Sequence, residues 1–258
     1  MLLTTLIALG LLQAAPATER AAVPPHRWTL DYGDTACTLA RRVAGDGSPI
    51  VILHAPLGME PGQLLVMDGG SGLDPRLESQ VEVRLDQGDP LTMRARREQR
   101  SGGAVINLLS PPADFLDRVA GGRILSVSQG GEVILSLPLD DAREAAEALG
   151  RCNDELLQSW GVDLAARRML SRKPLVTDFA WTFDVAPAGD AYVAFVANVS
   201  ERGRPLDCRI TFSTGDRRFN NAVCRTFRAR ARLEPALDAE GRPVAAQYVS
   251  GVRWYIRD

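Results

Sequence analysis

Residues 192–254 decide the fold of the C-terminal part of this chain, and they read YVAFVANVSERGRPLDCRITFSTGDRRFNNAVCRTFRARARLEPALDAEGRPVAAQYVSGVRW. The segment Tyr192 to Val199 is apolar or alternating, and a second such segment runs from Leu206 to Phe212. The turn sequence Ser200-Glu201-Arg202-Gly203-Arg204 separates them. Two such segments joined by a short glycine-containing turn predict a β-hairpin.

A helix and a further strand follow this hairpin. Asp216 is placed to cap the helix, which ends before Pro235. Its apolar stripe repeats at every fourth position, with Phe219, Val223 and Phe227. A last strand is expected from Ala245 to Ile256. The order strand, strand, helix, strand predicts a small ββαβ module.

This order and its turn motifs resemble the C-terminal domain of TonB-type proteins. The residues that carry the resemblance are Gly203, Ser213-Thr214-Gly215, Arg232-Leu233-Glu234-Pro235-Ala236 and Gly241-Arg242-Pro243-Val244. The chain departs from that family in two respects: no Tyr-Pro pair precedes the first strand, and there is no long proline-rich spacer. The resemblance implies a module at residues 178–258 that binds protein segments.

Members of that family bind an extended receptor segment by adding it as a strand to a sheet edge. The resemblance implies that the last strand is this edge, with contact residues Gln247, Tyr248, Val249, Ser250, Gly251, Val252 and Arg253. Two alternatives remain open for an edge strand. In the first, the strand does not bind a partner segment because it is self-protected or paired in a dimer. In the second, its bulky residues are only part of the core.

The chain from Arg27 to about Leu137 has the period of two that is typical of strands. Its clearest unit is a hairpin in which Val81 to Leu85 and Leu91 to Ala95 flank the turn Gln87-Gly88-Asp89-Pro90. Further strands are expected at Ile50 to Ala55, Gln63 to Met67, Ala104 to Leu108, Ile124 to Gln129 and Val133 to Pro138. The fold class is therefore α+β, with an N-terminal β-rich domain and the small ββαβ domain after it.

A helix closes the β-rich domain. Its apolar face repeats every three or four residues, with Ala142, Ala145, Leu149, Cys152 and Leu156. That face is expected to pack on the sheet, within reach of a strand cysteine such as Cys37.

The layout of this domain is loosely similar to invasion-associated locus B proteins. The features that carry the similarity are Trp28, then Cys37, many strands, and the segments Asp114-Phe115-Leu116 and Gly121-Gly122-Arg123. The resemblance implies a periplasmic β-rich domain without enzymatic function.

Four cysteines, an even number, favour disulfides in an exported chain, and four cysteines allow three pairings. We expect Cys37 to pair with Cys152 and Cys208 to pair with Cys224. The second pair would close a short loop and stabilise the module by about 3 kcal/mol. A metal site is disfavoured, because no two cysteines have C-x-x-C spacing.

The first residues predict export. Leu2 to Leu12 is a short apolar run, and Ala14-Ala15-Pro16-Ala17 offers a cleavage site after Ala17. The run is shorter than the about 20 residues of a membrane-spanning helix. A cleaved signal at residues 1–17 and a periplasmic location follow, with an uncleaved anchor or a buried N-terminal element as alternatives. We expect the β-rich domain at 24–161, a linker at 162–177 and the ββαβ module at 178–258.

The composition excludes some function classes. A net charge of −2 and a pI near 5.8 give no overall attraction to nucleic acid. His26 and His54 are the only histidines, and there is no Gly-x-Ser-x-Gly, so no constellation indicates nucleophilic catalysis. No cofactor is implied. One side of the C-terminal helix carries Arg218, Arg225 and Arg232, spaced by sevens, with Arg228 close by; this is a site for an anionic partner or a solvated face.

These observations predict a non-catalytic cell-envelope protein that binds a protein partner, such as an outer-membrane receptor segment in TonB-dependent transport. Peripheral membrane association is compatible with this prediction. An envelope adaptor or assembly protein without energy transduction is the first alternative. A periplasmic hydrolase with its site between the domains is the second.

Overall fold

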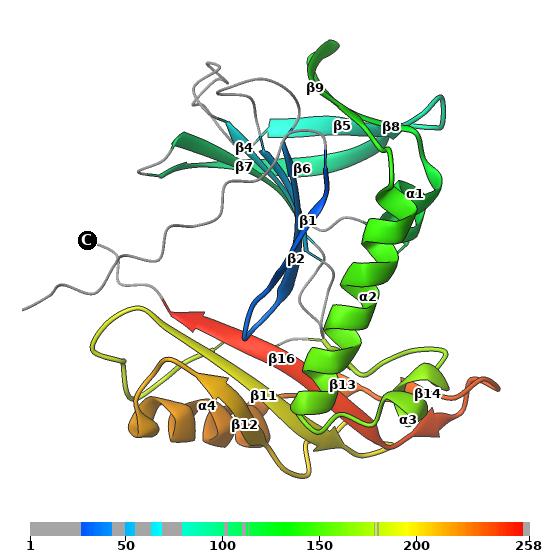
Figure 1. Cartoon of the computed structure of the whole chain (residues 1–258). Helices are drawn as coiled ribbons and strands as arrows, with labels where there is room; N and C mark the ends of the chain where they lie inside the picture. Colours follow the sequence, from blue (N-terminus) through cyan, green and yellow to red (C-terminus); the bar gives the residue numbers. More distant parts are fainter. Residues whose placement is uncertain are drawn as a thin grey trace, which may run out of the picture.

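The computed structural model describes residues 27–42, 50–54, 63–68, 79–100, 103–109, 112, 114–177, 179 and 181–254. The predicted signal segment 1–17 lies outside these residues. The fold is α+β, as the sequence predicts, with a large antiparallel sheet followed by a smaller sheet-and-helix module (Figure 1).

The large sheet has nine described strands in the order β1-β2-β3-β4-β7-β6-β5-β8-β9, and all neighbouring pairs are antiparallel. The strands are β1 (Thr29–Tyr32), β2 (Cys37–Arg42), β3 (Ile50–His54), β4 (Gln63–Asp68), β5 (Ser79–Leu85), β6 (Leu91–Arg100), β7 (Gly103–Leu109), β8 (Ile124–Gln129) and β9 (Glu132–Pro138). Each strand that the sequence predicts for this sheet is present within two residues of its predicted start.

The hairpin of β5 and β6 shows why these residues form strands. Val81 and Val83 are buried while Glu82 between them is exposed, because successive side chains of a strand point to opposite faces. Val81 lies opposite Met93, which is also buried. The predicted hairpin is confirmed.

Two helices pack on this part of the molecule, α1 (Phe115–Gly121) and α2 (Ala142–Ser159), and they contact each other. The predicted apolar face of α2 is confirmed, since its residues Ala142, Ala145, Leu149 and Cys152 join the core of the large sheet. The sequence did not predict α1, because seven residues are too few to display a clear helical period.

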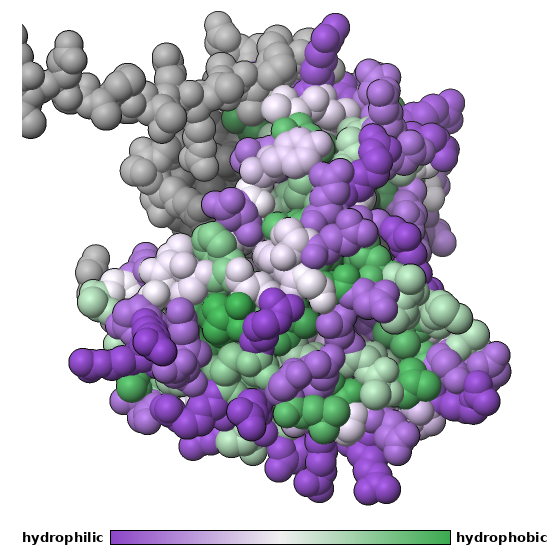
Figure 2. Space-filling model, turned by 60° about the horizontal axis from the view of Figure 1, so that its bottom comes forward, coloured by the Kyte–Doolittle hydropathy of each residue, from purple (hydrophilic) through white to green (hydrophobic). Residues whose placement is uncertain are grey.

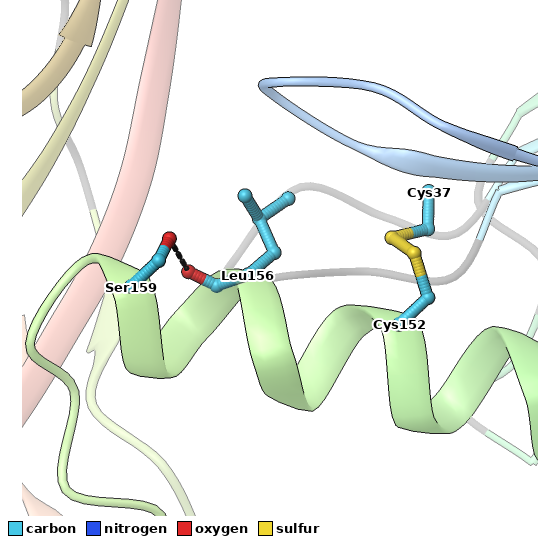
Figure 3. Close-up of a disulfide and its surroundings, with 4 residues drawn as sticks. All are labelled: Cys37, Cys152, Leu156 and Ser159. Carbon is cyan, nitrogen blue, oxygen red and sulfur yellow. Dashed lines mark hydrogen bonds between the residues drawn. A yellow bond between two sulfur atoms is a disulfide. The ribbon is translucent and has the colours of Figure 1, made fainter.

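Helix α2 joins the large sheet to the C-terminal module. Cys152 is disulfide-bonded to Cys37 on β2, as predicted, so the middle of the helix is fixed to the sheet (Figure 3). One turn later, Leu156 contacts both the core of the large sheet and a second apolar cluster. Leu157 and Trp160 belong to that second cluster, which lies against the C-terminal sheet.

The C-terminal sheet has the strand order β12-β11-β16 and is antiparallel. Its strands are β11 (Ala191–Val199), β12 (Arg209–Ser213) and β16 (Ala246–Trp254), and α4 (Arg217–Arg230) packs against β11 and β12. Shorter elements complete the module: α3 (Leu164–Arg168), β10 (Leu175–Val176), β13 (Leu233–Glu234), β14 (Ala236–Leu237) and β15 (Pro243–Val244). The element order strand, strand, helix, strand is as predicted, with the short pairs β10–β13 and β14–β15 added.

Strand β11 is covered on both faces. Val193, Phe195 and Ala197 face a cluster that includes α4, whereas Ala194 and Val196 face the cluster with Leu157 and Trp160. Because adjacent residues alternate between these clusters, five consecutive residues are buried. This explains a continuous apolar run within an antiparallel sheet.

Helix α4 begins as predicted, with the Asp216 carboxylate accepting a hydrogen bond from the Phe219 amide at 2.9 Å. It ends at Arg230, since Ala231 has extended backbone dihedrals. Arg232 therefore lies beyond the helix, and the prediction that it shares one helical face with Arg218 and Arg225 is wrong. The cause is the two-residue strand β13, which starts at Leu233 and pairs with β10.

The predicted linker, residues 162–177, contains α3 and β10. Val162 and Leu164 are buried in the same cluster as Trp160. The side chain of Asp163 caps α3 by accepting a hydrogen bond from the Ala166 amide at 3.0 Å. This segment therefore packs against the C-terminal sheet.

Candidate protein-binding edge

The predicted contact residues Gln247 to Arg253 all lie in β16, and β16 is an outer strand of the C-terminal sheet. Nine residue pairs align it with β11, from Ala191 opposite Trp254 to Val199 opposite Ala246. Among the described residues, no strand pairs with its other side. Within the part of the chain that the structure describes, the sheet ends at β16.

Hydrogen bonds on the other side of β11 determine which backbone groups of β16 face outward. The carbonyl of Tyr192 accepts from the Thr214 amide, and the carbonyl of Asn198 accepts from the Leu206 amide, both on the β12 side. Even-numbered residues of β11 thus direct their backbone groups toward β12. Odd-numbered residues of β11 direct theirs toward β16, because the direction alternates along a strand.

In the register of this pair, an odd residue of β11 always lies opposite an even residue of β16, as Phe195 lies opposite Ser250. Even residues of β16 therefore exchange hydrogen bonds with β11. The odd residues direct their N–H and C=O groups away from the sheet, and these are Gln247, Val249, Gly251 and Arg253. Within the described part of the chain, no backbone hydrogen bond engages these outward groups.

The bulky side chains of β16 belong to the core. Tyr248 and Val252 are buried in the cluster with α4, and Val249 is buried in the cluster with Trp160. The alternative in which these residues serve the core is thus correct for their side chains. The outward backbone groups are a separate feature of the same strand.

Polar contacts at both ends of β16 fix its position. The Oε1 atom of Gln247 accepts from the Asp163 amide at 2.8 Å, and its Nε2 donates to the Gly161 carbonyl at 3.3 Å. Near the other end, the exposed guanidinium of Arg253 lies 4.9 Å from the ring centroid of Tyr192. Such cation–π contacts stabilise exposed sites by about 0.5–1 kcal/mol.

A disulfide and an aromatic cluster connect helix α4 to the sheet and its loops. Cys208 is bonded to Cys224 of α4, as predicted, across 16 residues of sequence. Phe227 lies 4.8 Å from Phe195 and stacks on Tyr248 at 5.3 Å between ring centroids. Helix α4 therefore packs against one face of the strand that carries the candidate edge.

A groove of about 570 Å³ lies beside the start of β16. Helix α3 contributes Ala166 and Arg167, Leu170 follows the helix, and β16 contributes Ala246 and Gln247. Burial lowers the pKa of the Arg167 guanidinium, and the negative charge of Asp154 opposes this effect. The groove is lined mainly by apolar groups, together with Arg167 and the carboxylates of Asp163 and Asp207.

Among the described residues, no group of three or more His, Cys, Asp or Glu side chains is placed to hold a metal ion. His26 lies outside the part of the chain that the structure describes. None of the described helices combines the length and apolar character needed to cross a membrane.

The sequence located the strand and both disulfides, and the structure brings Gln247 to Arg253 onto one edge. The sequence did not reveal which residues of β16 direct their backbone N–H and C=O groups outward. The apolar pattern is compatible with outward groups on the odd-numbered residues or on the even-numbered ones. It also missed the contacts of Gln247 with Gly161 and Asp163, for which sequence alone carries no signal.

No protein-family model matches the chain, and a search of curated proteins found no match. Among solved structures, it is similar to invasion associated protein B from Bartonella henselae, with a TM-score of 0.36 and 14% identity over 48% of this chain and 94% of that chain. That is the family whose layout the N-terminal domain resembles. The TonB resemblance rests on its sequence motifs and stays a hypothesis.

Proposed function

We propose that this chain is a non-catalytic protein of the cell envelope that binds an extended protein segment by strand addition to β16. The observation that carries the proposal is the set of outward backbone groups on Gln247, Val249, Gly251 and Arg253. In strand addition, main-chain hydrogen bonds supply affinity and pockets for alternate side chains supply selectivity.

Two features of the module support this function. The strand is held on its inner side by nine aligned pairs with β11, so its outer side is ordered before a partner arrives. Preorganisation of this kind lowers the cost of binding. The groove next to Gln247 would accept an apolar side chain from one end of the added strand.

The cysteine pairs support an exported protein, because disulfides form and persist in oxidising compartments. We place the protein in the periplasm, with residues 1–17 removed as a signal. An adaptor that binds an envelope protein is favoured over a transducer of energy, because the chain has no long proline-rich spacer. Coupling to an outer-membrane receptor stays a prediction.

Site-specific photo-crosslinking in the native envelope tests this proposal. A photo-reactive amino acid replaces Arg253 of the edge strand in the full chain, and a control variant carries it at Arg228 on α4. Both positions are exposed. We expect a protein partner to be captured from position 253 and not from position 228.

The captured segment is then made as a peptide, and hydrogen exchange of single amides is measured with and without it. Strand addition predicts slower exchange at the outward amides of Val249 and Gly251. Little change is expected at Ser250 and Val252, whose amides already donate to β11. Equal changes at both sets, or none, would reject strand addition.

A further inference from the structure

Helix α4 has a second surface that points away from the sheet. Its 14 residues include five arginines and no acidic residue. Phe219, Val223 and Phe227 face the core. The exposed side, here called the arginine face, consists of Arg217, Arg218, Arg225 and Arg228.

Most of the arginine face lacks a partner of opposite charge. Arg225 pairs with Asp184 at 2.9 Å. Throughout the described residues, the guanidinium groups of Arg217, Arg218 and Arg228 have no acidic partner. A solvated helix face is usually stabilised by mixed charges four residues apart, and α4 has none.

The positive surface continues beyond the helix. The amide of Leu233, just after α4, donates to the Gly203 carbonyl at 3.0 Å, which docks the β11–β12 turn against the end of the helix. That turn carries Arg202 and Arg204, and both are exposed. From Arg217 to Arg228 alone, the arginine face spans about 16 Å at 1.5 Å per residue.

The overall composition does not account for this surface. The chain has a net charge of −2, and α4 contributes five positive charges, so the remainder of the chain has a net charge of −7. The helix is therefore a basic element in an otherwise acidic protein. Such a separation of charge orients a protein toward anionic partners.

We propose that the arginine face of α4 binds the surface of an anionic phospholipid membrane. Guanidinium groups match phosphate oxygens with paired hydrogen bonds, and a row of them along a helix suits a layer of headgroups. The apolar side of α4 is buried under the sheet, so the helix would adsorb to headgroups without inserting.

The position of α4 in the molecule leaves this helix accessible to a membrane surface. Helix α4 lies on the side of the module opposite the nine-stranded sheet (Figure 1). A membrane in contact with α4 would therefore leave the nine-stranded sheet facing away from the lipid. Figure 2, which brings this side forward, shows hydrophilic side chains projecting along much of the rim of the module. The surface does not involve the outward groups of β16, so the inference is independent of the proposed function.

The test is sedimentation of the full chain with vesicles of phosphatidylcholine alone or with about 30 mol % phosphatidylglycerol. The variant Arg217→Gln, Arg218→Gln, Arg228→Gln removes the three unpaired arginines. The matched control is Arg123→Gln, Arg143→Gln, Arg151→Gln, which removes the same charge from exposed positions on the N-terminal part. Folding of each variant is checked by circular dichroism.

We expect binding only to the anionic vesicles, with loss at about 0.5 M salt. Each arginine near an anionic surface changes partitioning about five-fold, so the α4 variant should bind about 100-fold more weakly and the control nearly normally. Equal losses in both variants, equal binding to neutral vesicles, or no binding would overturn the proposal. So would competition by inorganic phosphate at constant ionic strength, which would indicate a single-anion site.

Discussion

Val249 and Ser250 are neighbours in β16, but their backbone groups face opposite sides of the strand. Ser250 lies opposite Phe195 and exchanges hydrogen bonds with β11, whereas the N–H and C=O of Val249 point away from the sheet. The side chain of Val249 is buried nonetheless. One residue thus contributes its side chain to the core and its backbone to the candidate binding edge.

The turn at Gly203 should be intolerant of any side chain. Its φ of +70° is left-handed, and an added Cβ would lie 1.7 Å from the Leu233 carbonyl oxygen. Gly203→Ala is expected to cost more than about 3 kcal/mol, because backbone strain adds to the displacement of Leu233. The change in unfolding free energy is measured by urea denaturation.

Gly241 provides the control for that substitution. Its φ is +77°, but no atom lies within 4 Å of an added Cβ. Gly241→Ala should therefore cost only the backbone strain of about 1–2 kcal/mol. Equal effects of the two substitutions would show that the contact between Gly203 and Leu233 is unimportant.

The two disulfides should differ in their contributions to stability. Cys208–Cys224 spans 16 residues and Cys37–Cys152 spans 115. The chain-entropy relation gives about 3 kcal/mol for the shorter loop and about 4.7 kcal/mol for a loop of about 100 residues. The paired alanine variants are compared by denaturant unfolding, and a larger loss for the Cys208–Cys224 pair would contradict this order.

Acid should weaken the turn between β14 and β15 through Asp238. The backbone amide of Arg242 donates to this carboxylate at 2.8 Å and, with further bonds from the Arg242 side chain and the Glu240 amide, lowers its pKa below the ordinary 3.8. The folded pKa is below the unfolded one, so the stabilisation is present above about pH 4 and is lost as pH falls through the folded pKa.

Asp238→Asn should therefore flatten the acid side of a stability-against-pH curve measured between about pH 2 and pH 6. Asp89→Asn, at an exposed position in the β5–β6 turn, is the matched control for the loss of one surface carboxylate. An unaltered curve for Asp238→Asn would exclude the turn as a source of acid sensitivity.

Much of the fold followed from local patterns in the sequence. Alternation at Val81 to Leu85 and the four-residue spacing of Phe219, Val223 and Phe227 reflect burial on one face, and both elements are present. The short elements did not follow, since α3 and β13 are fixed by tertiary contacts. Leu164 packs under β11, and β13 pairs with β10.

The candidate site was predictable only in part. The apolar run and the preceding turn located β16, but the direction of its backbone groups depends on bonds made by Tyr192 and Asn198 to the far side of β11. The arginine face was misjudged at Arg232, because the end of α4 is set by the pairing of Leu233 with Val176. Both features depend on contacts between distant segments.

The most direct test of strand addition compares Val249→Pro with Ser250→Pro in the full chain, using the peptide identified by crosslinking. Proline at position 249 removes an outward N–H and no bond of the ladder with β11, although it also replaces a side chain that packs in the cluster with Trp160. A Val249→Pro variant that keeps a native circular dichroism spectrum should bind the peptide at least about ten-fold more weakly. Proline at position 250 removes a ladder bond and should destabilise the module. A folded Val249→Pro variant that binds the peptide with unchanged affinity would contradict the account.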